Sequence, residues 1–144
     1  MKNQKGVTLL ELIIVMVIIA IGATLMVPGI SSWMPHYRLR SATRDIASTM
    51  RIAQMKAISN NLTYQMSFDP ANGSFILKYD TGGTVVKDGD VQVLSSGVQF
   101  NTTFVGNIAY FFPDSRVTGG NVNLNNSKGS QKTISLAGRR IRIE

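Results

Sequence analysis

The first part of the chain shows two different hydropathy patterns. Residues 7–27 are apolar almost throughout, and Glu11 is the only charged residue among them. Beyond Pro35 the apolar positions recur every three or four residues, as Leu39, Ala42, Ile46, Met50, Ala53 and Ala57. Arg38, Arg44, Arg51 and Lys56 lie off this stripe. The spacing predicts an amphipathic helix from Pro35 to about residue 60, with its apolar side packed on a sheet.

From Leu62 onward apolar and polar residues alternate, which is typical of strands with one buried face. The pattern predicts strands at 62–68, 75–79, 91–94, 98–103, 108–112, 122–124, 132–136 and 140–143, and polar, Gly or Pro residues separate the first of them. The expected fold is therefore α+β, a long N-terminal helix packed on an antiparallel sheet or a small β-sandwich.

Charge is distributed unevenly along the 144 residues. Lys2 and Lys5 precede the apolar run, and residues 7–114 carry seven basic and seven acidic side chains. Residues 115–144 carry six basic side chains and one acidic, so the remaining positive surplus lies at the C-terminal end. The chain has no cysteine, which excludes disulfides and thiolate metal sites.

The apolar run is about 20 residues long, enough to cross a bilayer as a helix. Basic residues flank only its N-terminal side, which predicts a cytoplasmic N-terminus and an exported remainder. We expect a membrane helix over residues 7–34 and a soluble domain over 35–144. A cleaved secretory signal would have a shorter apolar core and a small-residue cleavage site. A plain membrane anchor leaves Glu11 unexplained, because a carboxylate facing lipid costs about 2.5–3.5 kcal/mol.

Cleavage between Gly6 and Val7 would explain Glu11. The new α-amino cation would lie four residues, or about one helical turn, before the carboxylate. The two charges could pair within one helix or between the packed helices of two subunits. Buried charges are tolerated when they are paired.

The stretch "KGVTLLELIIVMVIIAI" resembles the signal of type IV pilins and type II secretion pseudopilins. The resemblance implies that a prepilin peptidase removes residues 1–6 by cutting after Gly6 and methylates the amine of Val7. Glu11 then makes the assembly contact, and the apolar helix enters the core of a filament. It also implies a single-pass precursor in a bacterial inner membrane, an assembly platform there, and partner pilins or pseudopilins. Phenylalanine is commoner in the family where this chain has Val7.

The second half, "YFFPDSRVTGGNVNL" and "KTISLAGRRIRIE", is similar to the GspH/FimT group of minor pilins and pseudopilins. Ser115 stands where that group has a turn glycine, so the turn could differ here. The resemblance implies a structural subunit that starts assembly or lies at the filament tip, without enzymatic activity or a cofactor. A bend or local unwinding at Pro28 is also expected by this resemblance, whereas Pro28 could otherwise simply end the membrane helix.

The basic C-terminal residues carry the alternative hypothesis. In FimT-like minor pilins a Gly-Arg-x-Arg motif is associated with binding double-stranded DNA during uptake. Here the glycine of "GRRIR" lies one residue further upstream. If residues 140–143 form a strand, Ile141 and Ile143 face the core, and Arg140 and Arg142 point outward on the other side. On this hypothesis phosphates would be bound by Arg139, Arg140 and Arg142 with Lys128 and Lys132 nearby. The competing interpretation is that Asp80, Asp88 or Asp90 neutralises these cations, or that they contact a neighbouring subunit.

Other chemistry finds little support in the sequence. The aspartates Asp69, Asp80, Asp88, Asp90 and Asp114 accompany turn residues, where carboxylates usually bond to the backbone. Asp88-Gly89-Asp90 has too few ligands for a calcium loop, so no metal site is predicted. His36 is the only histidine, and we expect it to be structural.

Overall fold

The structure is a computed structural model that describes residues 7–144, without the side chains of residues 25–31. The chain forms two compact units, Met1–Met34 and Pro35–Glu144. The leader predicted over residues 1–6, including Gly6, lies outside the described residues.

The first unit consists of the N-terminal part of helix α1, whose full extent is Leu9–Asn60. Its apolar side chains are largely exposed, from 77% for Leu9 to 49% for Ile13. Among the described residues, no helix combines the length and the apolar character that crossing a membrane requires. The helix continues through Pro28 without interruption. Within residues 9–60, Pro28 therefore neither ends the helix nor unwinds it locally.

In the second unit α1 continues as the amphipathic helix that the sequence predicted. All six residues of the predicted stripe are buried, with at most 3% of each side chain exposed. Ala47 and Thr43 extend this buried face, and the Thr43 hydroxyl donates to the carbonyl of Leu39 at 2.7 Å. That bond satisfies the polar group inside the core.

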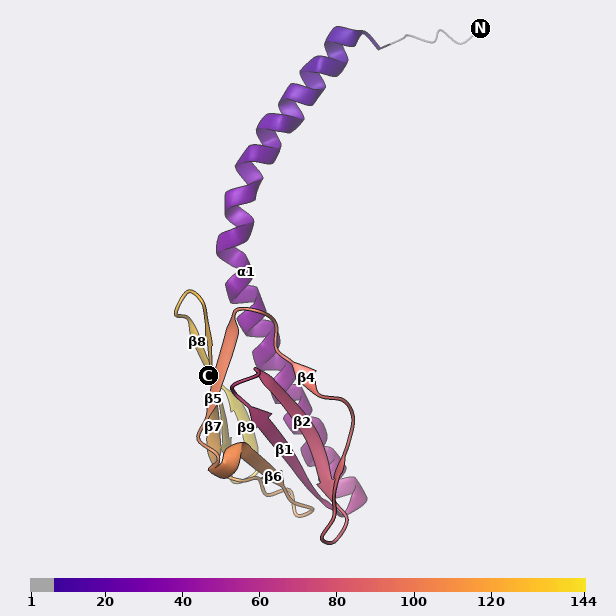
Figure 1. Cartoon of the computed structure of the whole chain (residues 1–144), viewed down its shortest axis with the longest axis vertical. Coiled ribbons are helices and arrows are strands. Elements are labelled where there is room, and N and C mark those ends of the chain that lie inside the picture. The colour runs from indigo at the N-terminus through magenta and orange to yellow at the C-terminus, as the bar shows by residue number, and fades with distance from the viewer. Residues whose placement is uncertain (1–6) are drawn as a thin grey trace, which may run out of the picture. The chain divides into compact units, whose positions relative to one another are not determined.

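Two antiparallel sheets lie along this part of α1 (Figure 1). The first contains β1 (Thr63–Asp69), β2 (Ser74–Asp80), β3 (Val85–Lys87), β4 (Gln92–Val93) and β6 (Ile108–Phe111). Its order is β3-β2-β1-β6, and β4 also pairs with β2. The second contains β5 (Val98–Thr102), β7 (Gly120–Asn126), β8 (Gln131–Ala137) and β9 (Arg140–Ile143), in the order β5-β7-β8-β9. A short 3-10 helix, η1 (Val105–Asn107), precedes β6.

The core fills the space between α1 and both sheets. The first sheet contributes alternate residues such as Tyr64, Met66 and Phe68, and the second contributes Val122 and Leu124, all 6% exposed or less. This alternation follows from the two-residue period of strands. The α+β fold is therefore confirmed, and each predicted strand overlaps an observed one. The short strand β3 was not predicted, because its three residues are all exposed and show no alternation.

Candidate functional site

The N-terminal end of α1 carries the candidate assembly contact. The backbone N–H of Glu11 donates to the hydroxyl of Thr8 at 3.3 Å, and the N–H of Leu12 donates to the Thr8 carbonyl at 3.3 Å. Thr8 is thus the N-cap, and Glu11 occupies the third helical position, the spacing of a capping box. A carboxylate in the first turn also interacts favourably with the helix dipole.

The carboxylate of Glu11 itself is free. It is exposed, and within residues 7–144 it takes part in no hydrogen bond or ion pair. Val7 is 72% exposed. Cleavage after Gly6 and methylation of Val7 remain predictions, because Gly6 lies outside the described residues. The local geometry leaves the acid available to a group from outside this chain.

The basic C-terminal residues lie on a hairpin formed by β8 and β9. The register places Arg140 opposite Ala137 and Arg142 opposite Ser135, and both arginines are exposed. They therefore lie on one face of an edge strand, the face turned away from the core. The predicted outward direction of Arg140 and Arg142 is confirmed.

The other side of β9 is less buried than predicted. Ile141 packs against the core, as expected. Ile143 is 40% exposed, so its predicted burial is wrong. The reason is its position at the margin of the sheet, where it lines an open hollow with Arg40 and Arg44 of α1 and with Lys132.

The predicted cluster of five cations does not form. Residues two apart in a strand point to the same face of the sheet, so Lys132 lies on the core side with the buried residues Ile134 and Leu136. This is the face opposite to Arg140 and Arg142. The remaining two cations occupy the two ends of the hairpin. Lys128 lies in the turn between β7 and β8, and Arg139 lies in the turn between β8 and β9. Seven-residue β8 separates these turns by about 20 Å at 3.3–3.4 Å per residue.

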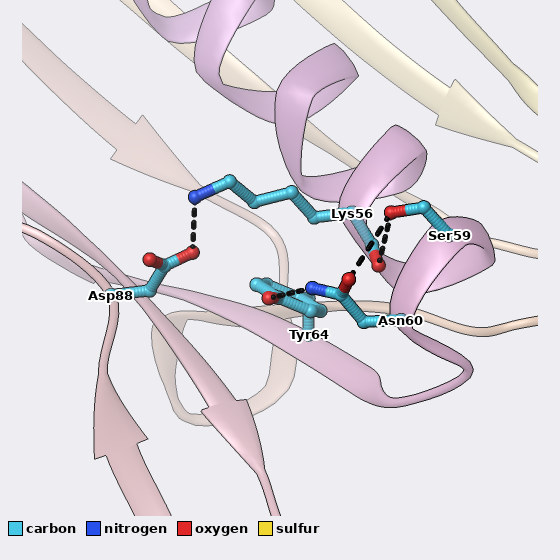
Figure 2. A network of polar contacts seen from close by, with 5 residues as sticks. All are labelled: Lys56, Ser59, Asn60, Tyr64 and Asp88. Atoms are coloured by element: carbon cyan, nitrogen blue, oxygen red, sulfur yellow. Dashed lines mark hydrogen bonds and ion pairs between the residues drawn. The ribbon is translucent and has the colours of Figure 1, made fainter.

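The aspartates named as neutralising partners do not pair with the C-terminal arginines. Asp88 forms an ion pair with Lys56, whose Nζ lies 2.7 Å from Oδ2 (Figure 2). Asp80 accepts hydrogen bonds from the backbone N–H groups of Gly82 and Gly83 at 2.9 and 2.7 Å. For these two carboxylates the neutralisation hypothesis is wrong.

A different carboxylate, that of Asp114, interacts with the charge of Arg139. The pKa of Asp114 is below its ordinary value, chiefly because the carboxylate accepts the backbone N–H of Arg116. The side chain of Arg116 also donates to Asp114 and pairs with it, and the charge of Arg139 acts in the same direction. Asp114 therefore offsets part of the positive charge at the Arg139 turn.

The ion pair with Lys56 engages Asp88, one of the two carboxylates considered above as calcium ligands. In Figure 2 the side chain of Lys56 reaches from α1 to Asp88, while Asn60 Nδ2 donates to the Tyr64 hydroxyl at 2.8 Å. Among the described residues, no three histidine, cysteine or acidic side chains come together as metal ligands would. Asp88 thus tethers the loop between β3 and β4 to α1.

His36 has a structural contact. Its Nδ1 lies 3.3 Å from the Ser130 hydroxyl in the β7–β8 turn. At the far end of the same helical segment, Gln54 Nε2 donates to the carbonyls of Ser115 and Arg139 at 2.8 and 3.2 Å. The two contacts show that α1 runs alongside the β8–β9 hairpin.

The sequence analysis missed the contribution of α1 to the basic surface. Arg40 and Arg44 lie one turn apart and reach the same hollow as Lys132. Their spacing was visible in the sequence. Their proximity to the C-terminal strand could not be read there, because it depends on which face of the sheet the helix covers.

The comparisons with known proteins agree with this geometry. Residues 1–27 match the prokaryotic N-terminal methylation motif, and residues 42–139 match the type II transport protein GspH family. The chain belongs to the GspH family. The second match covers most of the chain and includes α1 from Ala42 together with the sheets up to Arg139. No curated protein sequence matches the chain.

Solved structures of a minor pseudopilin and of a type IV minor pilin share the fold. The minor pseudopilin EpsH from the type 2 secretion system of Vibrio cholerae superposes with a TM-score of 0.65 at 10% identity, over 74% of this chain and 96% of EpsH. The type IV minor pilin FimU of Pseudomonas aeruginosa gives a TM-score of 0.62 at 12% identity, over 76% of this chain and 90% of FimU. At these identities the likeness concerns the fold.

Proposed function

We propose that this GspH-family chain is a minor subunit of a helical pilin-like filament, either a type IV pilus or a type II secretion pseudopilus. The observation that carries the proposal is the free carboxylate of Glu11 in the first turn of α1, together with the exposed apolar side chains of this helix over residues 9–21. Such a helix must be covered by lipid or by other helices. Glu11, the only acidic residue in the sequence from 7 to 34, then needs a cation, which an α-amino group would supply.

The proposed sequence of events begins in the inner membrane. The precursor is held there by the apolar segment, with its N-terminus in the cytoplasm and its folded domain outside. A prepilin peptidase cuts between Gly6 and Val7 and methylates the new amine, which stays charged. The assembly platform then transfers the subunit into the filament, where the Val7 amine of one helix pairs with the Glu11 carboxylate of another. The chain acts by association and catalyses no reaction.

The decisive test separates the charge of Glu11 from its position in the helix cap. Glutamine can occupy the third position of a capping box as glutamate does, but it is neutral. We expect Glu11→Gln and Glu11→Val both to reach the membrane and both to be largely absent from sheared filaments, as quantified by immunoblotting. Incorporation of Glu11→Gln at the normal level would mean that the acid acts only as a helix cap, and would overturn the proposed contact.

Two further measurements complete this test. Thr8→Val removes the hydroxyl that caps Glu11, costs the helix about 0.5–2 kcal/mol and keeps the acid, so incorporation should persist. Mass spectrometry of the mature subunit should show a methylated N-terminus at Val7. A chain that still begins with Met1 would be a plain membrane protein.

Double-stranded DNA binding remains a second candidate function, and one observation favours it. Arg140 and Arg142 are exposed on the same face of an edge strand, two residues apart. Two cations imply at most two phosphate contacts, so a gel-shift affinity should fall with salt at a logarithmic slope of about −1.8. Replacing both arginines with alanine should abolish the shift. Unchanged DNA binding by that variant would exclude the face with Arg140 and Arg142 as the DNA-binding site.

A further inference from the structure

Strand β9 ends the second sheet, and among residues 7–144 no strand pairs with its outer edge. Its register with β8 determines which backbone groups face that edge. Thr133 and Glu144 exchange two hydrogen bonds, with N···O distances of 3.1 and 2.8 Å. In an antiparallel ladder such bonded pairs alternate with non-bonded ones. Ile141 and Ile143 therefore direct their N–H and C=O groups away from β8, to the open edge.

An open edge with both donors and acceptors is a template for another strand. A peptide in extended conformation can pair with both kinds of group. A nucleic-acid backbone offers acceptors at its phosphates, so the carbonyl groups of Ile141 and Ile143 would gain nothing from it. The backbone chemistry of the edge thus favours a polypeptide partner.

The side chains next to this edge indicate the charge of that partner. A hollow of about 220 Å³ lies beside Ile143, and its lining includes Arg40 and Arg44 of α1 and Lys132 of β8. Within the described part of the chain none of these three cations forms an ion pair. Two arginines one helical turn apart repel each other, so a carboxylate between them would relieve an unfavourable interaction.

The spacing of the cations fits a strand that runs along α1. Four residues of helix rise about 6 Å, which is the axial separation of Arg40 and Arg44. Side chains on one face of a strand are about 6.6–6.8 Å apart. α1 runs alongside the hairpin, from the His36–Ser130 contact to the bond between Gln54 and the Arg139 turn. The arginines along α1 and the side chains on one face of a strand added to β9 would therefore follow the same direction.

We propose that the open edge of β9 binds an acidic, extended segment of a partner protein as an added strand. Its backbone pairs with Ile141 and Ile143, and carboxylates on alternate residues bind Arg40 and Arg44. Lys132 adds a third positive charge to the same hollow. The interaction is independent of the assembly contact at Glu11 and of the outward face that bears Arg140 and Arg142.

The test uses the full chain in detergent micelles and a fluorescent synthetic peptide of about seven alternating threonine and glutamate residues, a typical strand length. Binding is followed by fluorescence anisotropy. A matched peptide with glutamine in place of glutamate should bind at least about tenfold more weakly, since it lacks the charge-assisted bonds. The same acidic peptide methylated on alternate backbone nitrogens should also lose affinity. Equal binding of the methylated peptide would show that no strand is added and would overturn the proposal.

Variants of the chain locate the site. Arg40→Gln combined with Arg44→Gln should weaken peptide binding about tenfold or more, whereas Arg51→Gln, an exposed arginine further along α1, should change it less than about twofold. Ile143→Pro removes an N–H that faces the open edge and leaves the β8 ladder intact, so it should fold and bind weakly. Ile143→Ala controls for the lost side chain and should bind more tightly than the proline variant.

Two outcomes would overturn the assignment. One is unchanged peptide affinity in the Arg40 and Arg44 double variant. The other is displacement of the peptide by duplex DNA together with loss of peptide binding in an Arg140→Gln, Arg142→Gln variant, which would assign the site to the outward face and to nucleic acid. Failure of the Glu11 experiment would leave all these readouts unaffected.

Discussion

The rings of Phe68 and Phe100 meet edge to face, with centroids 5.8 Å apart and 68° between their planes. Phe68 belongs to β1 of the first sheet and Phe100 to β5 of the second, and Phe104 stacks on Phe68 at 5.9 Å. This aromatic cluster joins the sheets. Phe68→Ala should therefore lower the free energy of unfolding by about 3–5 kcal/mol, through lost burial and a remaining cavity.

Urea unfolding followed by circular dichroism measures this loss. Val105 is 93% exposed and serves as the control. Val105→Ala should change the free energy of unfolding by less than about 0.5 kcal/mol, as surface substitutions usually do. A loss below about 1 kcal/mol for Phe68→Ala would show that the sheets are held together mainly by other contacts.

Gly120 lies against the same cluster. A Cβ atom at this position would lie 2.6 Å from two ring carbons of Phe104 and 3.2 Å from the Thr103 hydroxyl oxygen. Phe104 is 5% exposed, so its ring has little room to move. Gly120→Ala should cost at least about 1–3 kcal/mol, as measured by the urea midpoint, through overpacking against Phe104 and through backbone strain, because the φ of Gly120 is 157°.

The neighbouring Gly119, which has no positive φ, provides a control for adding a methyl group to this turn. A Cβ on Gly119 would meet nothing closer than the Leu136 carbonyl at 3.8 Å. Gly119→Ala should thus leave the midpoint nearly unchanged. Equal effects at the two positions would rule out the Phe104 contact as the cause.

Ser115 occupies the turn position at which the resemblance to the GspH/FimT group led us to expect glycine. Its φ is 65°, so the turn keeps the left-handed backbone that glycine would adopt, although a serine occupies it. Left-handed conformation costs a residue with a side chain about 1–2 kcal/mol, and glycine avoids that cost but loses about 0.4–1 kcal/mol through its freer unfolded state. Ser115→Gly should therefore raise the free energy of unfolding, by about 0–1.6 kcal/mol net.

Gly138 tests the same argument in reverse. Its φ is 63°, and nothing lies within 4 Å of a Cβ added there, so only the backbone opposes a side chain. Gly138→Ala should lower the free energy of unfolding, by up to about 1.6 kcal/mol net. If both substitutions shift the urea midpoint in the same direction, left-handed strain is not the controlling factor at these turns.

The helix and the strand positions could be predicted because each depends on a local period. The six residues from Leu39 to Ala57 recur with the helical repeat, and all are buried. The alternation from Leu62 likewise placed β1 almost to the residue. The capping of Glu11 by Thr8 was not predicted, although the Thr-x-x-Glu spacing is visible in the sequence.

The arrangement of the basic residues could only partly be predicted. Lys132, Ile134 and Leu136 occupy every second position along β8, and this spacing in the sequence already indicated that Lys132 points to the core side of the strand. The turn at Gly138 interrupts the alternation of faces, so the outward direction of Arg140 had to be argued from the apolar residues Ile141 and Ile143 of its own strand. That Arg40 and Arg44 approach Ile143 depends on how the helix packs across the sheet, which no local pattern specifies.

The ion pair of Lys56 and Asp88 makes stability depend on pH in the alkaline range. The pKa of Lys56 is raised above its usual 10.5, mainly because its ammonium donates to Asp88, while partial burial acts in the opposite direction. A raised pKa in the folded state means that the pair stabilises fully below the unfolded pKa and loses its contribution as the pH rises through the folded pKa. A double-mutant cycle with Lys56→Gln and Asp88→Asn should give a coupling of about 0.2–1 kcal/mol at neutral pH, since the Lys56 side chain is 42% exposed. The coupling should disappear above the raised pKa, and a coupling that persists there would mean that the contact acts through packing and not through charge.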